Sequence, residues 1–556
     1  MSPENEQTVE PSLSSEGEGC QDRRGQPGEP GNCPTATTPV NATAGSAGAE
    51  RVTRVERLRD ESCGGGRESP TAGASVQGAR PEPAAAAVGA AHSSEEGGND
   101  AGAKGPYLVE GNSAVEDAVM AAKWWLRTPE KVRKLQRTLY RKAKANKAWR
   151  AWSLYGDLCR RDVLEAALVA VVRNGGKPGA DGITVEQVNV GREAILDELQ
   201  TQLRERSYRP SPVLRVWIPK SDGKQRPLGI PTVKDRIVQM GLLFLLQPIF
   251  EADFHEHSYG YRPGKSAHQA LEAIREAIRQ GYHEVIDADL SGYFDTIDHA
   301  GLLKLVARRV SDGSILKLVK QFLKAPIVER VGRKQRITSN KTGTPQGGVI
   351  SPLLANIYLN SLDHQANQPE TGAKLVRYAD DFVLLCRVGR APALRQRLEA
   401  YLGAKGLKLN AAKTRTLDVQ RGESFRFLGF EVTWRKSPRT GRHYVHVEPS
   451  GKSQTAIRET VREALNHWTL GESCTAQVRR LNAVLRGWGG YFYYGHCTRT
   501  FRRVQHWTQE RLRAWLWQKY GRTHSRYGFF TNARLVGQYG LYQLPLLAPW
   551  KPTADR

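Results

Sequence analysis

The chain has 556 residues, and its Lys and Arg outnumber Asp and Glu by 25, so it has room for several domains and a strongly basic surface. No apolar run approaches the ~18–20 residues of a membrane span, and the chain begins without an apolar signal segment. Its seven cysteines form no C-x-x-C pair, which argues against structural zinc and predicts a reduced, cytoplasmic protein. Such a charge favours a polyanionic partner, most simply nucleic acid, with a merely soluble basic surface as the alternative.

Residues 1–110 differ in composition from the rest of the chain. They carry 9 Lys and Arg against 17 Asp and Glu, whereas the remainder carries a net charge of +33. All 12 tryptophans follow this segment, and its one aromatic residue is Tyr107. So little apolar surface cannot form a core, and we expect a disordered, acidic, low-complexity tail.

A basic segment follows at residues 130–150. It holds nine basic residues and one acid, interleaved with apolar residues at helical spacing, which predicts an amphipathic helix. The basic face is either solvated or in contact with phosphates. The candidate RNA-binding residues here are Arg133, Lys134, Arg137 and Arg141.

Residues 211–246 predict a strand, an Asp222-Gly223 turn, a second strand and an apolar helix. Lys220 and Arg226 flank the turn. On a twisted two-stranded ribbon the two side chains could converge on one phosphate chain, or they could be two exposed edge-strand charges.

Four acidic residues stand at or near the ends of short apolar runs. Asp287 and Asp289 have the same parity in a predicted strand and should face the same side. Tyr378-Ala379-Asp380-Asp381 lies between two apolar runs, which places two adjacent carboxylates at the turn of a hairpin. Adjacent carboxylates repel, so this turn is either solvated or close to a cation such as Mg²⁺.

Other segments complete the chain. Residues 343–356 predict a Gly/Pro loop that runs into an apolar helix, and residues 406–414 and 425–432 predict another strand pair. Residues 450–545 predict several helices rich in Arg and Trp. Aromatic residues among basic ones suit the stacking of unpaired bases, although for any single Trp a place in the helix-packing core is favoured and only the ensemble argues for RNA. The recurring residues are Trp468, Trp488, Trp507, Trp515 and Trp517.

The order of these blocks resembles that of bacterial group II intron reverse transcriptase–maturases over roughly residues 115–545. The resemblance lies in IPKSDGKQRPLGIP, SYGYRPGKSAHQA, DLSGYFDTIDH, GTPQGGVISPLLANIYL, RYADDF, GLKLNAAKT, FLGF and LNAVLRGWGGYFYYG. It implies an α+β right-hand polymerase with fingers and palm of reverse-transcriptase type, followed by an α-helical thumb/maturase domain. The expected bounds are 115–280 for the fingers, 281–445 for the palm and 450–545 for the thumb/maturase domain.

The resemblance also implies a site. Two Mg²⁺ ions would be held by Asp289, Asp380 and Asp381 with the main-chain carbonyl of Leu290, for phosphoryl transfer to a primer. Lys220 and Arg226 would grip the incoming triphosphate, and Phe294 would exclude a 2′-hydroxyl. Gln346 would contact the nucleotide or the template, and Lys413 is a candidate general acid, with an exposed lysine as the alternative. Phe427–Phe430 resembles the primer-positioning hairpin.

The implied function is RNA-directed DNA synthesis for a group II intron, together with maturase binding of intron RNA for splicing and retrohoming. The implied partners are intron RNA, an RNA template with a DNA primer, deoxynucleotides and a DNA target. No His-Asn-His endonuclease motif is found, so we expect the primer to come from elsewhere. A freestanding, domesticated reverse transcriptase used in defence or DNA repair is the alternative. Further candidate RNA-binding residues are Arg479, Arg480, Arg486, Arg502 and Arg503.

Overall fold

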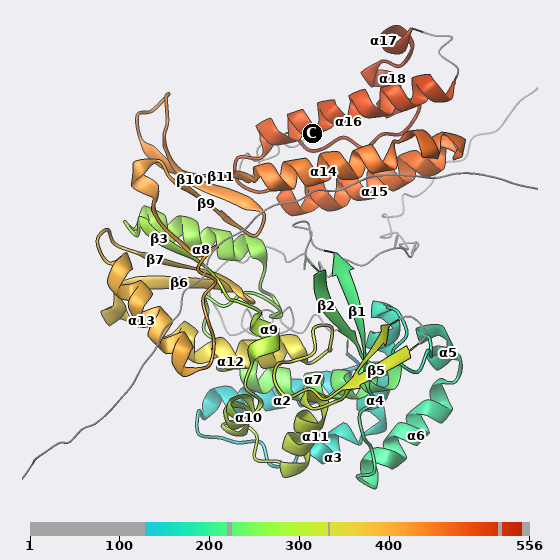
Figure 1. Ribbon diagram of the computed structural model, residues 1–556, viewed down its shortest axis with the longest axis vertical. Coiled ribbons are helices and arrows are strands. Elements are labelled where there is room, and N and C mark those ends of the chain that lie inside the picture. The colour runs from blue at the N-terminus through green and yellow to red at the C-terminus, as the bar shows by residue number, and fades with distance from the viewer. Residues whose placement is uncertain (1–127, 220–224, 332–333, 521–524, 547–556) are drawn as a thin grey trace, which may run out of the picture. The chain divides into compact units, whose positions relative to one another are not determined.

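The structure is a computed structural model that describes residues 128–219, 225–331, 334–520 and 525–546 (Figure 1). The acidic tail expected over residues 1–110, the Asp222-Gly223 turn and Lys220 lie outside the described residues.

The first part of the described chain is helical. The helices are α2 (Glu130–Ala145), α3 (Leu154–Leu158), α4 (Arg161–Asn174), α5 (Val185–Val190), α6 (Arg192–Arg204) and α7 (Val233–Glu251). Helix α7 is buried along nearly all of its length, and both α2 and α4 pack against it. Helix α2 buries Val132, Leu139 and Ala143 and leaves most of its basic residues outward, which confirms the amphipathic prediction. It ends at Ala145, earlier than the 130–150 pattern implied, because Asn146 is extended.

A four-stranded sheet follows, with the strand order β2-β1-β4-β5. Its strands are β1 (Val213–Pro219), β2 (Gln225–Ile230), β4 (Ile327–Val331) and β5 (Lys334–Thr338). Strands β1 and β2 pair antiparallel, as the hairpin signal predicts, and β1 pairs parallel to β4. Strand β5 forms one edge of the sheet, and all five of its residues are exposed.

A second four-stranded sheet has the order β6-β7-β3-β8. Its strands are β3 (Glu284–Asp289), β6 (Ala373–Tyr378), β7 (Asp381–Cys386) and β8 (Arg415–Asp418). Their apolar residues, such as Val285, Leu375 and Leu384, are fully or almost fully buried, as continuous apolar runs predict. The helices around this sheet are α8 (Ala267–Arg279), α9 (Tyr293–Thr296), α10 (His299–Ala307), α11 (Gly313–Leu323), α12 (Ser351–Ala366) and α13 (Ala391–Ala404).

One strand prediction is wrong. Residues 406–414 form a loop that makes a single bridge, Leu290 with Leu409, rather than a strand. The pair at 425–432 is instead a hairpin of its own, β9 (Ser424–Phe427) with β10 (Phe430–Lys436), which β11 (His443–Pro449) extends to a three-stranded sheet. Asn410 holds the loop, because its backbone N–H donates to the carbonyl of Asp289. The loop therefore bonds to the end of β3 instead of forming a strand ladder.

Helices make up the last part of the described chain. Helices α14 (Gly451–Ala464), α15 (Cys474–Phe492) and α16 (Thr498–Lys519) lie side by side, as Figure 1 shows, and α17 (Arg526–Phe529) and α18 (Asn532–Gly537) follow. Their shared core includes Val461, Leu481 and Leu512. The mixed α/β arrangement with a C-terminal helical region confirms the coarse fold prediction. Among residues 128–546 with their gaps, no helix is long and apolar enough to cross a bilayer.

Candidate functional site

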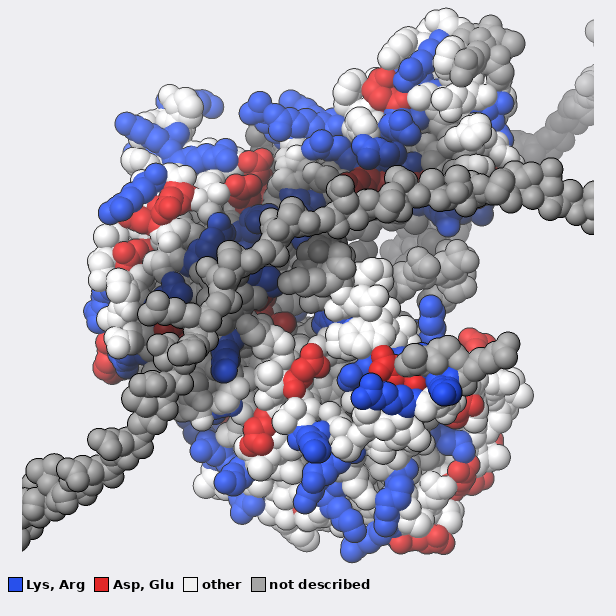
Figure 2. All heavy atoms as spheres, in the orientation of Figure 1, with Lys and Arg blue, Asp and Glu red and all other residues white. Residues whose placement is uncertain are grey.

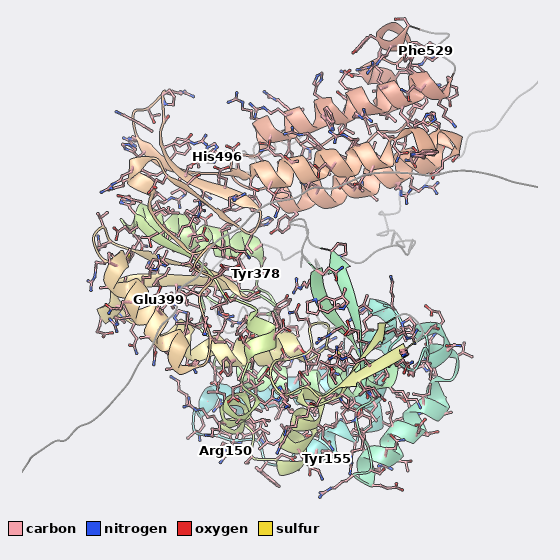
Figure 3. All side chains as sticks on the ribbon, viewed as in Figure 1. Arg150, Tyr155, Tyr378, Glu399, His496 and Phe529 are labelled. Carbon is pink, nitrogen blue, oxygen red and sulfur yellow. The ribbon has the colours of Figure 1, made fainter. Side chains whose placement is uncertain are left out.

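The three predicted carboxylates come from neighbouring strands of the second sheet. Asp289, the last residue of β3, is the register partner of Asp381, the first residue of β7. Asp380 lies in the two-residue turn between β6 and β7, directly after Ala379. Tyr378, labelled in Figure 3, is the last residue of β6 before that turn. The hairpin prediction is therefore confirmed, and the pairing brings the carboxylate of Asp289 to the same end of the sheet.

The turn that carries Asp380 has an uncommon backbone. Ala379 has φ +60°, a conformation that glycine usually adopts in hairpin turns. Gly260, from the SYGYRPG block, approaches this turn so closely that a Cβ atom there would lie 2.3 Å from the Ala379 nitrogen. The close approach requires glycine at position 260 and fixes the turn from outside.

A fully buried arginine braces the same turn from inside. Arg377 forms an ion pair with Asp363 (Nη2–Oδ2, 2.5 Å), and its guanidinium also donates to Asn356 Oδ1 at 2.8 Å. A further bond runs from Arg377 Nη1 to the carbonyl oxygen of Ala379 at 2.8 Å. Because buried charge is tolerated only when it is paired and hydrogen-bonded, this network holds the turn in one arrangement.

The negative charges of the carboxylates repel one another, and burial disfavours their charged forms. Burial, with the charges of Asp287, Asp380 and Asp289, raises the pKa of Asp381 to about 7. Burial also raises the pKa of Asp380, which Arg226 and Arg377 partly oppose. Crowded, partly buried carboxylates that resist ionisation fit a divalent cation, since such an ion would stabilise their charged form through the oxygen ligands that Mg²⁺ prefers. Within the described ranges, no three His, Cys, Asp or Glu side chains already form a metal-binding cluster.

Asp289 is held by the loop at residues 406–414. Lys413 Nζ lies 3.1 Å from Asp289 Oδ2, and Asn410 Nδ2 donates to the same oxygen at 3.2 Å. The ammonium group of Lys413 therefore partly compensates the charge of this carboxylate. Leu290 follows Asp289 and is buried. The Phe427–Phe430 turn also reaches the site, since the Leu428 backbone is close enough to Asp381 to lower its pKa.

The predicted nucleotide-binding residues form a second group. Arg226 Nε donates to Gln346 Oε1 at 2.7 Å, and Gln346 Nε2 donates to Asp295 Oδ2 at 3.2 Å. Arginine only donates and carboxylate only accepts, so this pair of neighbours fixes the orientation of the Gln346 amide. Phe294 is buried, and its carbonyl accepts the Thr344 N–H at 2.7 Å, which joins the P-Q-G loop to this segment.

The candidate RNA-binding residues lie apart from the carboxylates in the sequence and mostly at the surface. On α2, Lys134 and Arg141 are exposed, whereas Arg133 and Arg137 are half-buried and both pair with Glu130. The five candidate arginines on α15 and α16 are exposed, and Figure 2 shows basic side chains gathered over this helical region. These residues are Arg479, Arg480, Arg486, Arg502 and Arg503.

The tryptophans of the helical region divide into two kinds. Trp515 is 2 % exposed and belongs to the core, and Trp488, Trp507 and Trp517 are partly buried against that core. Trp468 is 89 % exposed, in the short 3₁₀ turn η3 (His467–Gly471) between α14 and α15. Packing therefore accounts for four of the five, and Trp468 is the one that presents its ring to solvent.

Several site residues escaped sequence reasoning. Arg377, Asp363, Asn356 and Gly260 support the carboxylate turn, and Asp295 supports Gln346. The one available signal was Arg377 itself, a charged residue inside an otherwise apolar strand run. Asp363 and Asn356 lie on the preceding helix α12, 14 and 21 residues before Arg377, and no spacing rule connects them to the turn.

Comparisons with known proteins match two families along the chain. Residues 218–432 match the family described as reverse transcriptase (RNA-dependent DNA polymerase), and residues 454–533 match the group II intron maturase-specific domain. Protein YkfC of Escherichia coli is 36% identical over 312 residues, which cover 49% of this chain and 80% of YkfC. The group II intron-encoded protein LtrA of Lactococcus lactis is 28% identical over 348 residues, which cover 51% of this chain and 57% of LtrA.

Among solved structures, a chain of a partial Cas6-RT-Cas1–Cas2 complex aligns with 23% identity and a TM-score of 0.28, over 45% of this chain and 42% of that one. The maturase-specific match disfavours the freestanding defence or repair enzyme as the alternative. With a reverse transcriptase domain followed by a maturase-specific domain, with YkfC as a relative and with LtrA as a group II intron-encoded relative, the chain belongs to the family of group II intron reverse transcriptase–maturases.

Proposed function

We propose that the chain copies intron RNA into DNA, with Asp289, Asp380 and Asp381 holding two Mg²⁺ ions at the end of the β6-β7-β3-β8 sheet. The in-register pairing of Asp289 with Asp381, next to the braced Asp380 turn, is the observation that supports this most directly. Reverse transcriptases use divalent metal ions, and the donor set here consists of hard oxygen ligands. The carbonyl of Leu290 would complete the set.

The metal ions would activate the primer 3′-oxygen and neutralise the charge of the triphosphate. The chain's own residues position the reactants. Arg226 binds phosphate oxygens, together with Lys220, which lies outside the described residues. Gln346, oriented by Arg226 and Asp295, contacts the incoming nucleotide or the template.

Two further residues would act on the nucleotide. Phe294 lies beneath the sugar and rejects a 2′-hydroxyl, which an apolar ring cannot hydrogen-bond. Lys413 leaves Asp289 when metal binds and donates a proton to the departing pyrophosphate. In this proposal the fingers span 115–280, the palm 281–445 and the thumb/maturase domain 450–545.

Primer extension on an RNA template tests this function. Purified chain with a DNA primer, deoxynucleotides and Mg²⁺ should give full-length DNA, and chelation of the metal should stop synthesis. Phe294→Val should raise ribonucleotide incorporation on the order of tenfold, because the ring that excludes the hydroxyl is shortened. Metal-independent synthesis, or unchanged sugar selection in the variant, would contradict the proposed site.

The second proposed function is maturase activity, in which the helical region binds intron RNA and promotes splicing and retrohoming at a DNA target. The exposed arginines of α15 and α16 support it, since they could neutralise phosphates without occupying the carboxylate site. Self-splicing of the chain's own intron should speed up at low Mg²⁺ when the protein is added. An intron that splices equally well with and without the protein would count against this role.

A further inference from the structure

The β9–β10 turn links the helical region to the carboxylate site. Leu428 and Gly429 occupy the turn with φ +51° and +79°, so both central residues are left-handed, as in a type I′ hairpin turn. Such a conformation is costly for leucine and persists only where its surroundings hold it. The contacts that hold it are therefore informative.

Those contacts come from the helical region. Tyr491 Oη on α15 donates to the carbonyl of Leu428 at 3.0 Å. The carbonyl of Gly429 accepts the backbone N–H of Ser450 at 2.9 Å and the hydroxyl of Ser453 at 2.8 Å. A Cβ atom on Gly429 would lie 3.2 Å from the Phe492 ring, so the turn is also tightly packed. Its geometry thus depends on α14 and α15.

The other side of the turn faces the candidate metal site. The Leu428 backbone lies close enough to the Asp381 carboxyl to lower its pKa, and β7 and β9 are in contact. Leu428 therefore receives the Tyr491 hydroxyl at its carbonyl, and its backbone lies next to the Asp381 carboxyl. Helix α15 also carries Arg479, Arg480 and Arg486, the last of them only five residues, or about 7.5 Å along the axis, from Tyr491.

We propose that Tyr491 is a positioning residue for DNA synthesis: its hydroxyl, from the helix that carries candidate RNA-binding arginines, orients the Leu428 peptide and through it the Asp381 carboxylate. This inference rests on the proposed polymerase function. It predicts that occupancy of α15 by RNA and the geometry of Asp381 are linked, so an effect on RNA binding at α15 reaches the rate of synthesis.

Tyr491→Phe tests the proposal, because it removes only the hydroxyl. The kcat for primer extension should fall about three- to tenfold, and the Mg²⁺ concentration for half-maximal rate should rise. The KM for deoxynucleotides and the affinity for intron RNA should stay within about twofold of the values for the unchanged protein. The thermal midpoint should stay within about 2 °C. Ser453→Ala, which removes one of two bonds to the Gly429 carbonyl, should give a smaller loss in the same direction.

Tyr494→Phe is the matched control. Tyr494 follows α15 closely, and its hydroxyl donates to Glu272 on α8 at 2.7 Å instead of to the turn. It should leave kcat and the Mg²⁺ midpoint unchanged. An unchanged kcat in Tyr491→Phe, or an equal loss in Tyr494→Phe, overturns the proposal. If the unchanged chain fails to extend a primer at all, the polymerase function itself fails, which distinguishes the two.

Discussion

The carboxylate sheet and the C-terminal helices of this chain use charge in opposite ways. In the sheet, a fully buried arginine, Arg377, is paired with Asp363 and bonded to the turn that carries Asp380. In the helices, the candidate RNA-binding arginines of α15 and α16 are exposed around a core of apolar residues and Trp515. A buried hydrogen-bonded network holds the site in a single arrangement, whereas exposed charges each add a similar amount to RNA affinity. Synthesis should therefore fail abruptly on mutation, and RNA binding should decline gradually.

The largest effect is expected from Asp380→Asn combined with Asp381→Asn. The exchange keeps the side-chain shape and removes both negative charges, so primer extension should fall by at least ~10³-fold. RNA affinity, measured by filter binding, should change less than twofold. Loss of both activities would show that the two regions are not separable.

Next in size is the structural role of Arg377. Arg377→Met leaves Asp363 buried without its partner, which should cost about 3–5 kcal/mol of unfolding free energy in urea titration. Arg415→Met is the control on the same sheet. Its pair with Asp287 is half-exposed, so less than about 1 kcal/mol should be lost. Equal losses would mean that burial of the brace does not matter.

The helical region should respond gradually. Replacing Arg479, Arg480 and Arg486 by Gln should weaken RNA binding at each salt concentration. It should also reduce the slope of log K against log salt by about 0.7 per charge that contacts phosphate. The same exchange at Arg397, Arg421 and Arg439, exposed cations outside this region, should leave the slope unchanged. Equal slopes for the two triple variants would remove α15 from the RNA interface.

The smallest effect separates two tryptophans. Trp468→Ala should reduce affinity for unpaired RNA by about 1–3 kcal/mol, the value of one stacked base, with no change in thermal midpoint. Trp515→Ala should instead destabilise the fold, because it opens a cavity in the core. Normal RNA affinity in Trp468→Ala would leave that ring without a role in binding.

The carboxylates could be predicted from the sequence because short patterns of neighbouring residues identify them. Asp289 ends a recognisable strand, and Asp380 and Asp381 stand between two apolar runs, so short patterns were enough to predict the hairpin. The residues that support the site belong to other segments of the sequence. Gly260, Asp363 and Tyr491 come close to it only when the chain folds. Spacing also misled at residues 406–414, where a strand-like pattern folds into a loop, because Asn410 and Lys413 bind Asp289 instead of pairing in a ladder.

Strand β5 carries a consequence for handling the protein. It forms a sheet edge with every residue exposed, including Ile337 at 65 %, and such edges invite the addition of a strand from another copy. Lys334 and Arg336 oppose that addition by charge repulsion. Salt near 1 M, the usual means of stripping nucleic acid from a basic protein, shortens the reach of this repulsion to about 3 Å. Freeing the protein of its ligand therefore also exposes it to self-association, and aggregation should begin at this edge.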